Sequence, residues 1–243
     1  VAGFVDATGY MLLSHIYTSN MTGNSIELSM HFIDGRWSEV LRRGWPVLMF
    51  VCGLVLSAIV TEVCVRREFL SFSAITLGLE ATLIAIFIHF GGSAFYHGEI
   101  HTSSLWNFNF LVALLAVAMG LQNQTITKIG ALSLYTTHVT GTLTKFGAEL
   151  SEYIFWLHDR AHTWRRLLSA LRLSSRRGDF RRLTVNMGLW IWFVIGAICA
   201  VSAKQKWHVH ALIAPIIVLI ALIWVDVTRP IAASAEEQQI QQH

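Results

Sequence analysis

The sequence predicts an all-α protein that crosses a membrane about six times. Only 14% of its 243 residues are charged and 54% are hydrophobic, whereas a soluble domain carries about 25% charged residues. The hydrophobic residues form runs near the roughly 20 residues that a helix needs to cross a bilayer. These runs lack the alternation of apolar and polar residues that a membrane β-barrel needs. A polytopic helical membrane protein is therefore the expected fold class.

Six apolar segments account for the expected spans. The first covers 1–16 and is expected to be shortened at its start, and the other five cover 45–65, 72–91, 105–126, 185–203 and 209–227. Two of them contain pairs of small residues four apart, Gly53 with Ser57 and Gly196 with Ala200. This spacing lets helices approach closely in lipid, so we expect helix crossings at these pairs.

A short polar phrase is written twice in this apolar chain. YTSNMTGN occupies 17–24 and YTTHVTGT occupies 135–142, and each phrase follows one apolar segment and precedes two more. This order predicts a duplication with halves 1–104 and 105–230. Because three spans is an odd number, the second half would insert upside down, as in the inverted repeats of many secondary transporters. An alternative with eight spans stays open, in which 13–34 and 129–157 cross as broken helices and the repeats are parallel.

Both phrases contain residues expected where a helix begins inside a membrane. Asparagine and threonine cap helix N-termini, and glycine lets a backbone break or be approached closely. Two N-termini that face each other near the midplane would bind an anion or a polar solute, because each presents free N–H groups and a partial positive charge. The expected site residues are Asn20, Thr22, Gly23, Asn24, Gln122, Asn123, Thr137, His138, Thr140, Gly141 and Thr142. Alternatively, both phrases are capped turns at the membrane surface that bind nothing.

Two carboxylic acids lie inside predicted spans, Asp6 in the first and Glu80 in the third. A carboxylate near the bilayer centre costs about 2.5–3.5 kcal/mol or more, so each should face the bundle or water. Both are candidates for coupling to protons or other cations. The alternative for Asp6 is a hydrogen bond to the polar phrase, and for Glu80 an interhelical pair or an interfacial position. A further hypothesis pairs Glu27 with Lys145, which occupy equivalent places after the two phrases.

The net charge of +3 is unevenly distributed. Eight arginines lie between 160 and 182, whereas 92–104 contains no Lys or Arg. The positive-inside rule therefore places 158–184 in the cytoplasm, and we expect the basic insert 151–184 to lie on anionic lipids. Three arginines on the opposite side do not fit this orientation, Arg36, Arg42 and Arg43. Nucleic-acid binding is not expected, and the polar tail 231–243 is expected to be disordered.

Three stretches surround the two phrases: GFVDATGYMLLSHIYTSNMTGN at 3–24, AMGLQNQTITKIG at 118–130 and TTHVTGTLTKFG at 136–147. They resemble the signature of the YoaK-type integral membrane proteins, which carry the domain of unknown function 1275. With the helix order, the resemblance covers nearly the whole chain, although the start is short and the basic insert is long for the family. It implies a multi-pass protein of a bacterial cytoplasmic membrane, suspected of transport and without an assigned substrate.

No catalytic motif accompanies this layout. A Gly-rich phosphate loop, a Gly-x-Ser-x-Gly motif and a nucleophile with its base are all missing from the sequence, so an enzyme is not expected. HGEIH and HVH supply too few ligands for a metal site, and no cofactor is expected. The expected function is a transporter or channel-like protein for a small polar or anionic solute, acting alone, as a homo-oligomer or within a larger complex. The alternative is a non-catalytic accessory or structural subunit of a larger membrane complex.

Overall fold

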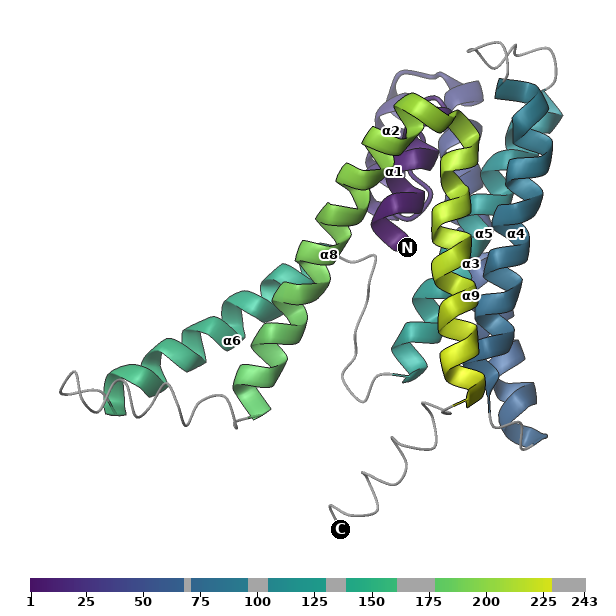
Figure 1. Cartoon of the computed structure of the whole chain (residues 1–243). Coiled ribbons are helices and arrows are strands. Elements are labelled where there is room, and N and C mark those ends of the chain that lie inside the picture. The colour runs from purple at the N-terminus through teal and green to yellow at the C-terminus, as the bar shows by residue number, and fades with distance from the viewer. Residues whose placement is uncertain (68–70, 96–104, 130–138, 161–177, 229–243) are drawn as a thin grey trace.

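The structure, a computed structural model, describes residues 1–67, 71–95, 105–129, 139–160 and 178–228. Within these ranges every regular element is a helix (Figure 1). In chain order the elements are α1 (Ala2–Leu12), α2 (Met21–Ile33), α3 (Trp37–Arg66), α4 (Phe72–Phe95), α5 (Leu105–Ile129), α6 (Val139–Arg160), α8 (Gly178–Trp207), the short 3-10 helix η1 (His208–Leu212) and α9 (Ile213–Thr228). The predicted class, an all-helical polytopic membrane protein, is confirmed.

Three stretches of the described residues are long and apolar enough to cross a membrane: Trp37–Arg66, Ser73–Gly92 and Leu183–Thr228. The third stretch contains most of α8 together with η1 and α9. It can supply two crossings, since the chain reverses direction at η1 (Figure 1). The first and fourth predicted spans are not among these stretches. α1 has only 11 residues, and polar residues near both ends of α5 lower its mean hydropathy.

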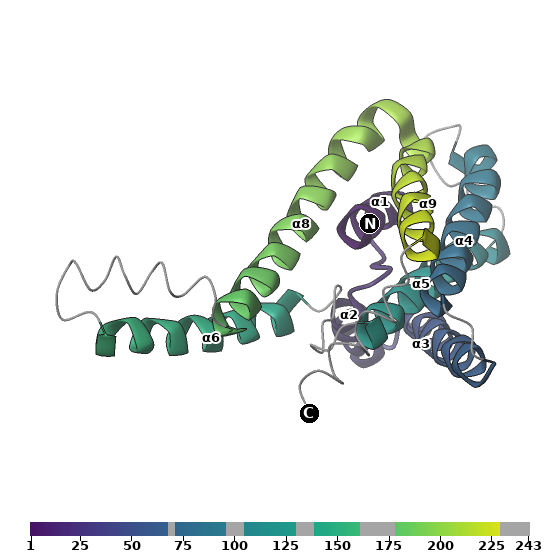
Figure 2. The ribbon, with the colours of Figure 1, turned by 60° about the horizontal axis from the view of Figure 1, so that its bottom comes forward.

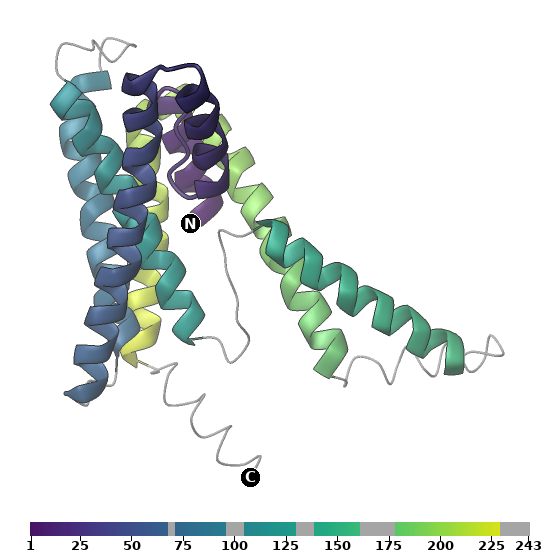
Figure 3. The ribbon, with the colours of Figure 1, turned by 180° about the vertical axis from the view of Figure 1, so that it is seen from behind.

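Helices at equivalent places in the two halves of the chain run in opposite directions. α3 descends from the top of the molecule in Figure 3, whereas α8 rises toward it. α4 and α9 are opposed in the same way, as are α1 and α5 (Figures 1 and 3). This is the geometry of an inverted repeat. The parallel repeats of the eight-span alternative would need equivalent helices to run the same way.

Two helix crossings in the bundle are built alike. α3 packs along α5, where a Cβ on Gly120 would lie 2.3 Å from the carbonyl oxygen of Phe50. α1 packs along α8, where a Cβ on Gly3 would lie 2.1 Å from the carbonyl oxygen of Phe193. Only glycine lets a helix approach another backbone this closely. The first helix of each half therefore packs against the third helix of the other half through the same kind of contact.

The predicted pairs of small residues lie at these crossings. A Cβ on Gly53 would lie 2.3 Å from the carbonyl oxygen of Val117, and a Cβ on Gly196 would meet the backbone of α1 at 3.2 Å. The hydroxyl groups of Ser57 and Thr125 lie 3.2 Å apart across the α3–α5 contact. Small-residue spacing in the sequence thus located both crossings.

Candidate functional site

The first polar phrase forms a sharp break between α1 and α2, and Asp6 holds this break. Oδ1 of Asp6 accepts hydrogen bonds from the backbone N–H groups of Thr18 at 2.9 Å and Ser19 at 2.8 Å, and from the Thr18 hydroxyl at 3.0 Å. All three residues are buried. The chain reverses just before them, where Ser14 and His15 have φ angles of 51° and 63°. The carboxylate therefore satisfies the donors of a non-helical segment inside the bundle.

Two asparagines shape the start of α2. Asn20 is the N-cap residue, and its Oδ1 accepts the N–H of Gly23 at 3.1 Å. Asn24 is fully buried and bridges back across the break, donating to the carbonyl oxygen of Tyr17 at 2.7 Å and accepting its N–H at 3.3 Å. Asn20 and Thr22 are exposed. These hydrogen bonds therefore fix the position of the first turn of α2, in which Thr22 is accessible.

Tyr17 adds a neutral donor beside this turn. The ring of Tyr17 packs beside the ring of Tyr10, with 4.7 Å between the centroids. A phenol is neutral at physiological pH, so the Tyr17 hydroxyl group can donate a hydrogen bond.

Arg43 fastens α3 to the break. Its Nη1 donates to the carbonyl oxygen of His15 at 2.7 Å, and its Nη2 lies 2.6 Å from Oε2 of Glu27 in α2. Arg43 is only 9% exposed, so this cation is integral to the fold. The hypothesis that Glu27 pairs with Lys145 is wrong as the structure stands, because the partner of Glu27 is Arg43 from its own half. In the sequence, Arg43 stands out only as a charge that does not fit the positive-inside pattern.

The second phrase is described only in part. Thr137 and His138 lie outside the described residues. α6 begins at Val139, the position equivalent to the start of α2. Thr140 and Gly141 are exposed in its first turn, and Thr142 is buried. Asn186 of α8 donates to Glu149 of α6 at 2.8 Å, so α6 packs on α8 as α2 packs on α3.

The two phrases lie on different helix pairs and begin helices of opposite direction. α2 runs from the middle of the molecule toward the top of Figure 3, and α6 runs from the middle toward the bottom. The first turn of α6 is the end of that helix nearest to α2 (Figures 2 and 3). Both helix N-termini therefore belong to the central part of the molecule, as the hypothesis of a midplane site requires.

Gln122 and Asn123 lie in α5, inside the bundle, and are 6% and 4% exposed. Oε1 of Gln122 has no hydrogen-bond partner among the described residues. α5 also approaches α1 beside the break: a Cβ on Gly9 of α1 would lie 2.7 Å from Cγ2 of Thr18 and 3.3 Å from Cδ1 of Leu115. The predicted α5 residues thus follow the segment of α5 that lies against α1 beside the first break.

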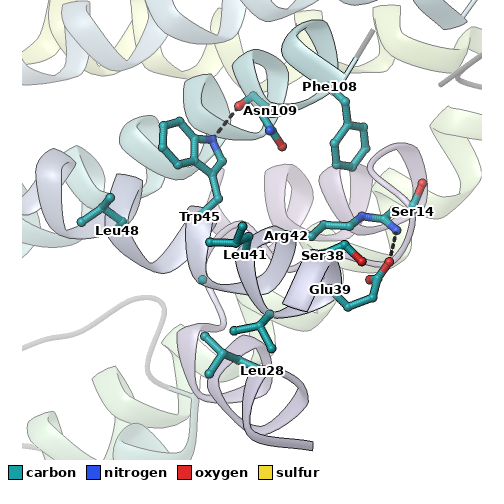
Figure 4. Close-up of a pocket in the computed structure, with 12 residues that line it drawn as sticks. Ser14, Leu28, Ser38, Glu39, Leu41, Arg42, Trp45, Leu48, Phe108 and Asn109 are labelled. Atoms are coloured by element: carbon teal, nitrogen blue, oxygen red, sulfur yellow. Dashed lines mark hydrogen bonds and ion pairs between the residues drawn. The ribbon is translucent and has the colours of Figure 1, made fainter. Parts of the chain in front are cut away.

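A pocket of about 850 Å³ opens where α2, α3 and α5 meet (Figure 4). The guanidinium group of Arg42 lies 5.0 Å from the centroid of the Phe108 ring and 3.5 Å from Oε1 of Glu39. Trp45 donates its indole N–H to the carbonyl oxygen of Asn109 at 2.8 Å. None of the predicted site residues lines this pocket. The leucine and aromatic side chains that line the pocket suit an apolar ligand, such as an acyl chain, better than a small polar solute.

Comparison with known proteins places this architecture in a family. A family model described as "Protein of unknown function (DUF1275)" matches residues 1–225. The chain belongs to the DUF1275 family. The UPF0700 transmembrane protein YoaK of Bacillus subtilis (strain 168) is similar to this DUF1275 protein, with 24% identity over 223 residues that cover 91% of this chain and 88% of the relative. No solved structure matches the chain.

The comparison confirms the resemblance predicted from the two phrases. The description of the family model assigns no activity. Of the two predicted coupling residues, Asp6 is occupied in holding the break. Glu80 lies apart from the break, in α4, and is fully buried.

Proposed function

We propose that this membrane protein transports a small polar or anionic solute, and that the solute binds between the first turns of α2 and α6. The observation that carries the proposal is the break anchored by Asp6. Irregular backbone at membrane depth is tolerated only where it is buried in protein or lines a cavity. Secondary transporters use such breaks to present helix N-termini to their substrates.

The chemistry of the two first turns supports a polar ligand. Thr22 in α2 and Thr140 in α6 are exposed and offer hydroxyl groups. Each lies at the positive end of its helix, where N–H groups without helical partners favour an anion. Asn20, Gly23 and Asn24 fix the first turn of α2, and Gly141 and Thr142 occupy the corresponding part of α6.

The same proposal places the protein in the cytoplasmic membrane of a bacterium. The basic insert 151–184 would lie against the anionic inner leaflet. Binding of the solute would need no cofactor and no catalytic residue, since every group invoked is a hydroxyl, an amide or a backbone N–H.

Transport currents from reconstituted protein test this function. Proteoliposomes on a solid-supported membrane would be exposed in turn to inorganic anions, small carboxylates and neutral amides. At least one solute is expected to give a current that Thr22→Val reduces about tenfold or more, which corresponds to about 1.4 kcal/mol of binding. Thr82→Val is the matched control, because Thr82 is exposed on α4 and bonds only to the carbonyl oxygen of Gly78 in its own helix. Equal loss in both variants would contradict the proposal.

A role as an accessory subunit is the second candidate. Large apolar side chains are exposed along α6 and α8, including Phe155 at 67% and Trp192 at 72%. These side chains would suit a partner helix as well as lipid. Co-purification of a membrane partner in fixed ratio, together with the absence of current from every solute, would favour this candidate.

A further inference from the structure

Among the described residues, three carboxylic acids are buried in the membrane-spanning bundle, and they differ in their hydrogen bonds. Asp6 accepts three hydrogen bonds at the break. Asp226 of α9 is 1% exposed and accepts from the hydroxyl group of Ser73 and from the N–H of Ala74 at 3.1 Å, so it caps the start of α4. Glu80 is fully buried, and neither of its carboxylate oxygens has a hydrogen-bond partner among the described residues.

Glu80 stands on the buried face of α4, at the boundary between polar and apolar residues. Ile84 and Phe87 follow it at helical spacing, and both are fully buried in the core. Ser73 and Thr76 precede it on the same face, 2% and 1% exposed. The Thr76 hydroxyl group donates to the carbonyl oxygen of Ser73 at 3.0 Å. Ser73 and Thr76 therefore form a stripe of two buried hydroxyl groups on the face of α4 that carries Glu80, between the N-terminal end of the helix and this residue.

Charged groups on the neighbouring helices do not neutralise Glu80. α4 packs against α5 and α9 and more lightly against α3 and η1, and α5 has no charged residue between 107 and 125. The charge on α9 is Asp226, which is held at Ser73.

The remaining described charged groups on the packed elements are exposed or paired with other residues. His208 and His210 of η1 are exposed. On α3, Glu62 pairs with Arg66, Glu39 with Arg42, and the buried Arg43 with Glu27 of α2. Glu80 therefore has an environment that strongly disfavours an ionised carboxylate.

We propose that Glu80 is a proton-binding site in the membrane core, held as a neutral acid in this conformation and reached along the stripe of Ser73 and Thr76. A proton needs only the carboxyl group itself. A metal cation would need several oxygen ligands at once, whereas no described polar atom forms a hydrogen bond with either Glu80 oxygen. This inference does not depend on the proposed transport.

Infrared spectroscopy of the purified protein in lipid tests the site directly. At neutral pH the wild-type spectrum is expected to contain the carbonyl band of a protonated carboxylic acid, and Glu80→Gln should remove it. Glu62→Gln is the matched control, since that carboxylate is exposed and paired with Arg66 at 2.8 Å. Absence of the band from the wild type, or its persistence in Glu80→Gln, would overturn the proposal.

Two further measurements extend the test. Thermal unfolding of Glu80→Gln should match the wild type, because an amide then replaces a neutral acid of the same shape. Unfolding of this variant at a clearly lower temperature would mean that an ionised Glu80 has a partner, which contradicts the proposal. For the route, transfer to heavy water should shift the band more slowly in Thr76→Val than in the wild type, and an unchanged rate would exclude this stripe as the path.

Discussion

Asp6 and Thr18 are joined by two hydrogen bonds to one carboxylate oxygen, one from the backbone N–H and one from the side-chain hydroxyl. The pair connects a helix to the segment that interrupts it. Because a buried N–H without a partner is costly, this contact makes the break between α1 and α2 a fixed part of the fold. The proposed solute site depends on that rigidity, since it sets where α2 begins.

Replacing Asp6 with alanine should destabilise the protein strongly. The substitution leaves the buried donors of Thr18 and Ser19 without an acceptor, at about 1–3 kcal/mol for each. Thermal unfolding in detergent measures the loss. Asp34→Ala is the control, because Asp34 is exposed and pairs only with exposed Arg36. The account is contradicted if the two variants unfold at the same temperature.

Alanine at the crossing glycines should also be destabilising. A Cβ at Gly3 or Gly120 would lie 2.1 Å or 2.3 Å from a carbonyl oxygen, so the helices would have to separate. The matched control is Gly78→Ala in α4, where a Cβ would meet nothing within 4 Å. That control should be neutral or stabilising by up to about 1 kcal/mol, because alanine favours a helix over glycine. Thermal unfolding in detergent compares the variants. If alanine at Gly3 and at Gly120 leaves the unfolding temperature unchanged, the close backbone contact at these crossings is contradicted.

Removing Arg43 should cost more than removing an exposed arginine. Arg43→Met breaks the ion pair to Glu27 and the bond to the carbonyl oxygen of His15, which together contribute about 1–3 kcal/mol. Arg66→Met is the control, because its pair with Glu62 is exposed and such pairs contribute about 0–1 kcal/mol. Chemical denaturation compares the two. Equal midpoints would show that Arg43 does not secure the break.

The sequence predicted the helical class, both crossings and the capped start of α2, because each leaves a local pattern. Small residues four apart mark a crossing, and Asn20 with Gly23 marks a helix start.

Features assembled from distant segments could be predicted only in part. A hydrogen bond from Asp6 to the polar phrase was one of the two interpretations of this residue, and the structure confirms it. Which donors it meets, Thr18 and Ser19, depends on the reversal at Ser14 and His15. The Glu27–Lys145 hypothesis assumed a contact between the two halves of the chain. Instead, α2 and α3 form a helical hairpin within the first half, and this hairpin places Arg43 against Glu27. The pocket beside Arg42 draws its walls from three elements.

Opposite directions of equivalent helices predict opposite sidedness in the membrane. Cysteines at Asp34, after α2, and at His158, near the end of α6, should react with an impermeant thiol reagent from opposite sides of oriented vesicles. The background would lack Cys52, Cys64 and Cys199, which are the native cysteines. Labelling of both positions from the same side would contradict the inverted arrangement.

Ligand-induced thermal stabilisation tests the central claim most directly, namely that the two polar phrases frame one solute site. The purified protein would be screened against small anions, carboxylates and neutral amides. At least one solute is predicted to raise the unfolding temperature of the wild type, and Thr22→Val and Thr140→Val should each abolish most of that shift while Thr82→Val preserves it. A panel without any stabilising solute, or a shift that survives both substitutions, would contradict the account.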